Sequence, residues 1–212
     1  SSTPKKAVTQ HGLSEQGRLQ ASQAASAFAD VCKGRHVAIF SSDFLRAKET
    51  AEIVLEHGVR PSAASCFRDG VVFDERLRER WFGDFDGTSV DNYKRVWLSD
   101  ARDANHTDFG VERVASVAKR TCKLLSELEH TLPSEAAPWA VLLVAHGDVL
   151  QIMQTAAAQR DPRTHRELEH LETAVLRPMN IVLPGGDADS LNAAYADYME
   201  YYDSQLTKGW KS

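Results

Sequence analysis

Apolar residues along this chain follow two patterns, short continuous runs and repeats at intervals of three or four positions. The runs at residues 37–40 and 139–145 are rich in valine, leucine and isoleucine, which is typical of strands buried in a parallel sheet. The helical interval predicts helices over residues 13–30, from Phe44 to about His57, around residues 93–97, over residues 111–128 and over residues 149–154. Strands and helices therefore alternate along the chain.

Turn-forming residues set the expected limits of these elements. Ser14 is expected to cap the first helix, and Gly58 and Pro61 to end the second. Further extended segments are expected at residues 73–77, 173–176 and 180–183, a turn at residues 184–186 and a terminal helix at residues 191–206.

Alternating strands and helices indicate an α/β fold, which we expect to be a three-layer α/β/α sandwich around a mostly parallel sheet. A chain of 212 residues can bury one sizeable core, so we expect a single domain over residues 1–212. The carboxyl ends of parallel strands lie at one edge of such a sheet. The polar turns Ser41-Ser42-Asp43 and His146-Gly147-Asp148 each follow a strand, so we expect them to open on the same edge.

Composition narrows the class of protein. The chain is 42% hydrophobic and 26% charged, which is ordinary for a folded protein, and its net charge of −5 argues against nonspecific nucleic-acid binding. Its longest apolar run is far shorter than the roughly 20 residues of a membrane-spanning helix, and no signal-peptide pattern follows the N-terminus. Cys32, Cys66 and Cys122 form no disulfide or zinc motif. We therefore expect a cytoplasmic protein that binds neither nucleic acid nor a membrane, and the sequence leaves its oligomeric state open.

His146 follows the longest apolar run directly, where an open α/β sheet usually binds its ligands. Gly147 would let the backbone approach a ligand closely, and the helix predicted next would direct its positive end to the same place. These features together outline an anion site. A core histidine followed by a turn glycine is an equally acceptable interpretation of the two residues taken alone.

Two further segments offer charged side chains for such a site. Arg46 falls in the first turn of the second predicted helix, where a guanidinium can bind a phosphate with two hydrogen bonds. Glu79 lies between two arginines and beside aromatic residues, which act on its protonation in opposite directions and leave its state open. The alternatives are an exposed arginine without a role and a surface cluster of ion pairs.

Four motifs in this order resemble the histidine phosphatase superfamily, which includes cofactor-dependent phosphoglycerate mutases. Residues 13–21 resemble the start of the family's first helix, and residues 41–51 resemble its Ser-Ser-Asp-Leu-x-Arg-Ala-x-x-Thr-Ala motif. Residues 77–83 resemble its Leu-x-Glu-x-x-x-Gly loop, and residues 144–147 resemble its second His-Gly site. Residues 110–114 resemble, with two changes, the Gly-Gly-Glu-Ser entry to a later helix.

The resemblance implies roles for the candidate residues. Arg46 and His146 would hold the transferring phosphoryl group, Gly147 would contribute its backbone, and Glu79 would protonate the departing alcohol oxygen. Fixed positive donors stabilise the charge that spreads over the phosphoryl oxygens, so neither a metal ion nor a cofactor is expected. The expected partner is a small phosphorylated metabolite or inorganic phosphate.

The family's nucleophile is the histidine of an Arg-His-Gly motif, and this sequence contains no such motif. His11-Gly12 precedes the first helix directly and is interpreted as a turn. We expect the nucleophile and a first strand to lie upstream of Ser1; the alternative is a catalytically inactive member that binds phosphoesters or partners. The leading expectation is a phosphomonoesterase acting through a phosphohistidine, and the nearest alternative enzyme is a phosphoglycerate mutase.

Some polar residues are assigned no chemistry. His165 and His170 do not share a helical face, so we expect solvated side chains and no metal site there. Arg80 and Asp148 can either touch the substrate or serve as a surface pair and a helix cap.

Overall fold

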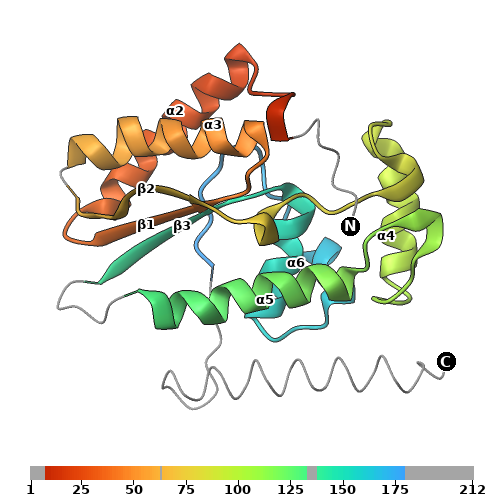
Figure 1. Ribbon diagram of the computed structural model, residues 1–212. Helices are drawn as coiled ribbons and strands as arrows, with labels where there is room; N and C mark the ends of the chain where they lie inside the picture. Colours follow the sequence, from red (N-terminus) through yellow and green to blue (C-terminus); the bar gives the residue numbers. More distant parts are fainter. Residues whose placement is uncertain (1–7, 63, 133–137, 180–212) are drawn as a thin grey trace. The chain divides into compact units, whose positions relative to one another are not determined.

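A computed structural model describes residues 8–62, 64–132 and 138–179 of the chain (Figure 1). These residues divide into two compact units. Unit 1 takes its described residues from 8–79, 138–147 and 171–178, and unit 2 takes its described residues from 80–132 and 148–170, together with Met179. The chain therefore passes from unit 1 to unit 2 directly after Glu79 and again directly after Gly147.

Unit 1 contains a sheet of three parallel strands, β1 (His36–Ser41), β2 (Cys66–Phe73) and β3 (Trp139–Val144). The order is β2-β1-β3, so the two strands predicted from apolar runs are neighbours. Ser41 pairs with Phe73 on one side and with Val144 on the other. The carboxyl ends of all three strands are therefore level, as the predicted shared edge requires.

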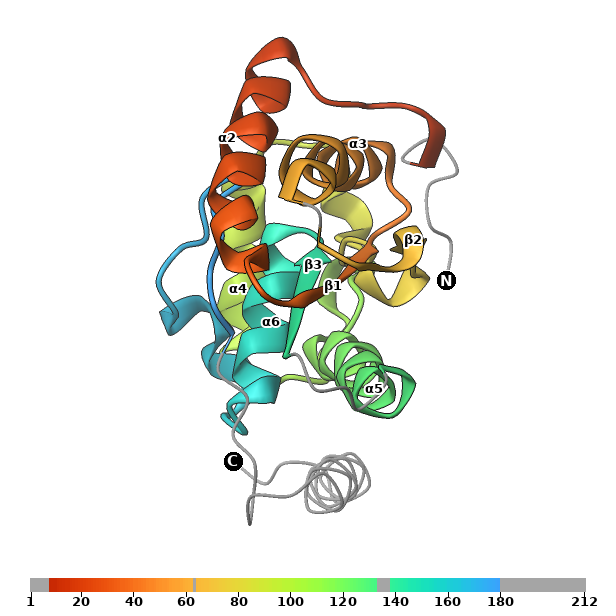
Figure 2. The same cartoon turned by 90° about the vertical axis from the view of Figure 1, so that its left-hand side faces the viewer.

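Helices α2 (Glu15–Cys32) and α3 (Leu45–Val54) pack with the sheet in unit 1 (Figure 2). Both are amphipathic, and their apolar residues meet those of β1 in one buried cluster. Its members include Ala25, Phe28, Cys32, Val37, Ile39, Ala51 and Val54. This core fixes the direction in which β1 delivers the turn that follows it.

The second predicted helix changes geometry before its end. After Val54 the chain continues as one π-helical segment (Leu55–Val59) and a 3-10 turn (Arg60–Ser62). A side chain at Gly58 would meet the carbonyl oxygen of Ala25 at 2.5 Å, so only glycine allows this approach of the segment to α2.

Ser14 caps α2 as predicted, because its side-chain oxygen accepts a hydrogen bond from the Gly17 N–H at 3.1 Å. Replacing Ser14 by alanine is expected to lower the free energy of unfolding by about 1 kcal/mol, since that N–H loses its partner. Ser22→Ala is the matched control: Ser22 is half-buried, and it donates to the Arg18 carbonyl within the helix instead of capping the helix end. Urea unfolding of the two variants checks this, and equal losses would refute the role of the cap.

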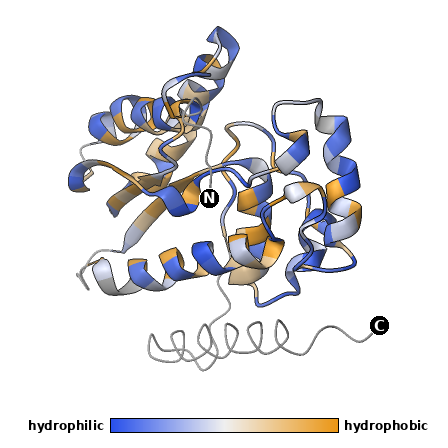
Figure 3. Cartoon of the chain, turned by 45° about the vertical axis from the view of Figure 1, so that its right-hand side comes forward, coloured by the Kyte–Doolittle hydropathy of each residue, from blue (hydrophilic) through white to orange (hydrophobic). Residues whose placement is uncertain are grey.

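Unit 2 is built from helices α4 (Tyr93–Asp100), α5 (Val114–Thr131) and α6 (Gly147–Ala157). The first residue of α6, Gly147, still belongs to unit 1. Figure 3 shows hydrophilic residues between more apolar ones along α5, as expected for an amphipathic helix. Short 3-10 helices connect these elements (Gly83–Phe85, Val90–Asn92, Asp108–Gly110 and Pro162–Glu167). Phe82, Val96 and Val111 form a small buried cluster, in which the rings of Phe82 and Tyr93 stack.

Two predicted extended segments are wrong. The strand expected at residues 73–77 lies earlier, as β2, because Asp74 accepts a hydrogen bond from the Arg76 N–H and starts a 3-10 helix (Glu75–Leu77). Residues 173–176 contain a turn, with Ala174 at a φ of 56°. The predictions for residues 180–183, 184–186 and 191–206 fall outside the described residues. Within the described part of the chain, no helix has the length and hydropathy needed to cross a membrane.

Candidate functional site

Three predicted site residues from distant parts of the sequence come together in unit 1. Arg46 follows β1, Glu79 follows β2 and His146 follows β3. Nη2 of Arg46 lies 2.9 Å from Nδ1 of His146, and Oε2 of Glu79 lies 3.9 Å from the same nitrogen. Parallel strands with level carboxyl ends bring these side chains together, as expected for an open α/β sheet.

Arg46 is the second residue of α3 and is only partly buried. A guanidinium group can only donate hydrogen bonds, so Nδ1 of His146 accepts the one from Arg46. The guanidinium carbon also lies 5.4 Å from the centre of the Phe44 ring, a position suited to a cation–π contact. Arg46 is therefore not fully exposed, and its guanidinium is held by His146.

The other side of the His146 ring is held by Ser42. Because Nδ1 accepts, the neutral ring carries its proton on Nε2, which donates to Oγ of Ser42 at 3.0 Å. The same oxygen accepts the Phe44 N–H at 3.2 Å, just before α3 begins. His146 is buried, with Phe44 against its ring at 5.2 Å between centres. The turn after β1 therefore orients the imidazole so that Nδ1 faces Arg46 and Glu79.

Glu79 keeps access to solvent, since its side chain is 25% exposed. Its backbone is held through the preceding residue, Arg78, which makes a two-pronged ion pair with Asp43 at 2.7 and 2.5 Å. Hydrogen bonding to Asp43 raises the pKa of the Arg78 guanidinium. This pair was not predicted from the sequence; its signal there is an aspartate in the turn after one strand and an arginine beside the candidate acid.

Arg80, on the other side of Glu79, is not part of a surface pair. It lies in unit 2 with only 1% of its surface exposed, and its guanidinium binds Asp100 and Asp148. Burial alone would raise the pKa of Asp148, but His165 and Arg80 outweigh it and hold that pKa below its ordinary value. The interpretation of residues 78–80 as a surface cluster is therefore wrong. Asp148 lies in the first turn of α6, where a helix cap was one of the two alternatives, but its side chain is buried with Arg80.

His165 also corrects a prediction. It is completely buried in unit 2, where its ring donates from Nδ1 to the Pro162 carbonyl at 2.9 Å and places Nε2 at 3.6 Å from Asp148. His170, by contrast, is exposed as expected. The proline that starts the 3-10 helix supplies the acceptor, which spacing along a regular helix does not reveal.

Gly147 is the first residue of α6, and a side chain added there would meet no atom within 4 Å. Packing therefore does not require glycine at this position. His11 lies before α2 and is exposed, with a φ of 64°, which agrees with its interpretation as a turn residue.

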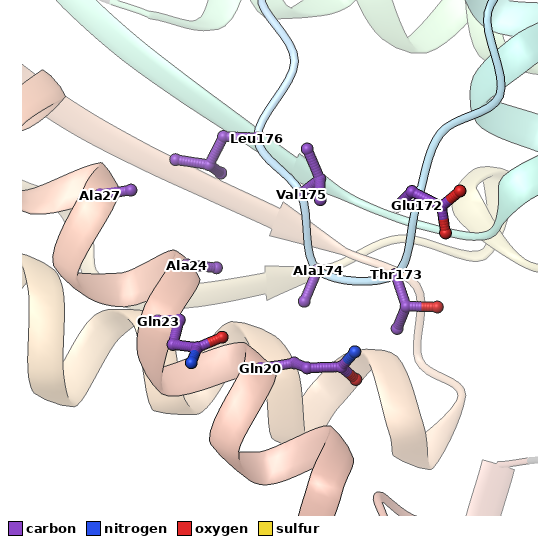
Figure 4. Close-up of a pocket in the computed structure, with 9 residues that line it drawn as sticks. All are labelled: Gln20, Gln23, Ala24, Ala27, Glu172, Thr173, Ala174, Val175 and Leu176. Carbon is purple, nitrogen blue, oxygen red and sulfur yellow. The ribbon is translucent and has the colours of Figure 1, made fainter.

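In the described part of the chain, neither a metal cluster nor the pocket of unit 1 involves the candidate residues. Among residues 8–62, 64–132 and 138–179, no group of three or more histidine, cysteine, aspartate or glutamate side chains is arranged to hold a metal ion. A pocket of about 530 Å³ lies between α2 and residues 172–176 of unit 1 (Figure 4). It is lined by glutamine, alanine, threonine, valine, leucine and one glutamate, and it includes none of the four candidate residues.

The fold and these residues define a family. The chain belongs to the histidine phosphatase superfamily, branch 1, whose model matches residues 6–181. This match confirms the resemblance seen in the four motifs, and the structural neighbours confirm the predicted fold class.

Relatives include a probable phosphatase of Schizosaccharomyces pombe, 28% identical over 143 residues, and the phosphoglycerate mutase-like protein 4 of Arabidopsis thaliana, 29% identical over 151 residues. Each alignment covers 68% of this chain, and the chain spans about 60% of the length of these curated relatives. Among solved structures, a mycobacterial glucosyl-3-phosphoglycerate phosphatase has a TM-score of 0.61 at 26% identity, covering 84% of this chain and 83% of that one. The same phosphatase in complex with inorganic phosphate has a TM-score of 0.57 at 27% identity, covering 76% of this chain and 75% of that one.

Proposed function

We propose that this protein is a phosphomonoesterase, with Arg46 and His146 binding the phosphoryl group, the Gly147 backbone N–H assisting them, and Glu79 acting as general acid. The single observation that supports this most is the convergence of Arg46, Glu79 and His146 at the carboxyl ends of three neighbouring strands. Phosphoryl transfer spreads negative charge over the equatorial oxygens, and a guanidinium with an imidazole supplies fixed donors for it.

The hydrogen bonds of His146 favour a particular protonation state when an anion is bound. Nε2 donates to Ser42, so the ring can donate from Nδ1 as well only when it is protonated as imidazolium. A phosphate dianion beside Nδ1 stabilises that cation. Arg46 would then turn its donors from Nδ1 to the phosphoryl oxygens, which both cationic groups would share.

The proposed reaction has two steps and uses neither a metal ion nor an organic cofactor. In the first, a histidine nitrogen forms a bond to phosphorus, the ester P–O bond breaks, and Glu79 gives its proton to the departing oxygen. In the second, water attacks phosphorus, the P–N bond breaks, and Glu79 takes a proton back. The nucleophile is assigned to the histidine of the family's Arg-His-Gly motif. His146 is assigned the companion role of a donor to the phosphoryl oxygens, because Ser42 holds its Nε2 and its Nδ1 faces Arg46 and Glu79.

The substrate is proposed to be a small phosphorylated metabolite in the cytoplasm. Two of the relatives bear phosphatase names, and one acts on glucosyl-3-phosphoglycerate. Phosphoglycerate mutase activity is the second candidate, because another relative is named for its likeness to mutases. The family resemblance implies that the stretch between Glu79 and His146 is shorter than in cofactor-dependent mutases. A shorter stretch favours hydrolysis, since a mutase must exclude water from its intermediate.

Incubation of the full-length protein with p-nitrophenyl phosphate and with 3-phosphoglycerate separates these functions. We expect release of inorganic phosphate and formation of an acid-labile phosphoenzyme. Rapid interconversion of phosphoglycerates with little phosphate release would establish the mutase instead. Binding of phosphate with no turnover of either compound would identify a non-catalytic binding protein and refute the proposal.

A further inference from the structure

On the basis of the proposed function, we propose that the buried cluster of Arg80, Asp100 and Asp148 is a positioning device that keeps the acid Glu79 in register with His146. The three residues of this cluster lie in unit 2, and none is assigned to binding the phosphoryl group. Their place in the sequence links them to the site: Arg80 directly follows Glu79, and Asp148 is the second residue after His146.

The guanidinium of Arg80 is bound on every side. Nη1 and Nη2 each donate to a different carboxylate oxygen of Asp100 at 2.7 Å, and Nη1 also donates to Asp148 at 3.2 Å. Nε donates to the Glu112 carbonyl at 2.8 Å. The side chains of Arg80 and Asp100 are fully buried, and that of Asp148 is 4% exposed. With its donors directed at these protein acceptors, Arg80 has a fixed geometry.

Each aspartate is held in turn by further groups. His106 donates from Nε2 to Asp100 at 2.6 Å, since its Nδ1 accepts the Asp108 N–H. Trp97 donates its indole N–H to Asp148 at 3.1 Å. The carboxylates therefore have little freedom to follow Arg80 if it moves, and the cluster behaves as a rigid unit.

Stability alone does not explain such a cluster. Apolar residues of similar volume usually stabilise a protein as much as a buried ion pair or more, because desolvation of the charges is costly. An ion pair with fixed directions sets the spacing between two chain segments more narrowly than apolar contacts do. Here it joins the segment that begins after Glu79 to the segment that begins after Gly147.

The fixed position of Arg80 affects the position of its neighbour Glu79, the proposed acid. Arg80 and Glu79 are consecutive residues whose Cα atoms lie about 3.8 Å apart, so a displacement of the Arg80 backbone moves Glu79 as well unless the backbone dihedral angles between them absorb it. On the other side of Glu79, Arg78 is held by Asp43. Glu79 is thus held by arginine–aspartate pairs on both sides, and a misplacement of about 1 Å can cost about 100-fold in rate.

The test uses two substrates that differ in their need for an acid. Phenyl phosphate has a poor leaving group that requires a proton, whereas p-nitrophenyl phosphate releases a stable anion without one. In Arg80→Lys and in Asp148→Asn we expect kcat for phenyl phosphate to fall by about tenfold or more, with KM and the kcat for p-nitrophenyl phosphate changed by less than about threefold. Arg163→Lys is the matched control, because Arg163 also pairs with an aspartate in unit 2, and it should change neither activity.

A double-variant cycle separates positioning from structural support. If Arg80 acts through Glu79, then Arg80→Lys should have less than about a twofold effect in a Glu79→Gln background. Multiplicative effects, or an equal loss with both substrates, would overturn the inference while leaving the phosphatase activity in place. Circular dichroism shows whether Arg80→Lys and Asp148→Asn fold. If one of them does not fold, the other still tests the inference. A wild-type protein inactive on both substrates would instead overturn the proposed function and this inference with it.

Discussion

Replacing Arg46 by alanine is expected to lower kcat/KM for p-nitrophenyl phosphate by about 1,000-fold, the largest loss of activity anticipated for a single exposed or half-buried side chain here. The guanidinium supplies both a charge and paired hydrogen bonds to the phosphoryl oxygens, whose charge grows in the transition state. His146 cannot take its place, because its ring is held by Ser42 and it follows a different strand. Steady-state kinetics of the wild type and the variant measure the loss.

The loss of kcat/KM reports on phosphoryl binding only if the Arg46→Ala variant is folded. The Arg46 side chain is only partly buried, so the free energy of unfolding should change by less than about 1 kcal/mol. Wild-type protein should melt at a higher temperature with inorganic phosphate than without it, because phosphate binds the folded state, and Arg46→Ala should lose most of this shift.

Arg60→Ala is the matched control for this variant. Arg60 also lies in unit 1 and forms an exposed pair with Glu56, at 2.9 Å. Exposed pairs contribute little, so both its activity and its phosphate shift should match those of the wild type. If Arg46→Ala keeps more than about a tenth of the wild-type kcat/KM, Arg46 does not bind the phosphoryl group as proposed.

Arg46 and His146 could be predicted as site residues from the sequence because each stands shortly after a strand that an apolar run identifies. Apolar runs identified β1 and β3, and the polar residues that follow them had to lie at one edge once the sheet was parallel. Arg46 and His146 therefore meet where the pattern placed them. Glu79 was found through its motif, although the strand before it was placed several residues too late.

What the sequence did not reveal depends on partners far apart in the chain. Arg78 and Arg80 look alike beside Glu79, yet one pairs with Asp43 and the other is buried with Asp100 and Asp148. The spacing of apolar residues does not distinguish these two arginines, because a charged side chain is buried only where the fold places a carboxylate beside it. His165 was misplaced for the same reason: its acceptor, the Pro162 carbonyl, exists only in the 3-10 turn.

Local hydrogen bonds explain the misplaced strand. Residues 73–77 have an apolar start, but the Asp74 side chain accepts from the Arg76 N–H at 2.8 Å and turns the backbone out of the sheet. Aspartate competes with regular structure in this way whenever a nearby N–H is available. The resulting turn brings Arg78 to Asp43 and so contributes to the position of Glu79.

Gly83, the last residue of the Leu-x-Glu-x-x-x-Gly motif, is expected to be the glycine of unit 2 least tolerant of substitution among those described. Its φ is 55°, and an added Cβ would lie 1.9 Å from the Phe109 carbonyl oxygen and 2.6 Å from the Gly110 carbonyl carbon. Both obstacles are backbone atoms, so no rotation of a side chain relieves the clash. Gly83→Ala should therefore lower the free energy of unfolding by about 4 kcal/mol, the sum of left-handed strain and overpacking.

Gly87→Ala separates these two contributions. Gly87 has a φ of 73°, but a side chain added there would meet nothing within 4 Å. It should cost only about 1 kcal/mol, the penalty for placing alanine in the left-handed region. Urea unfolding of both variants decides the matter, and equal losses would show that Phe109 and Gly110 move aside at little cost. A large difference would mean that the motif glycine is required for close backbone packing four residues beyond Glu79.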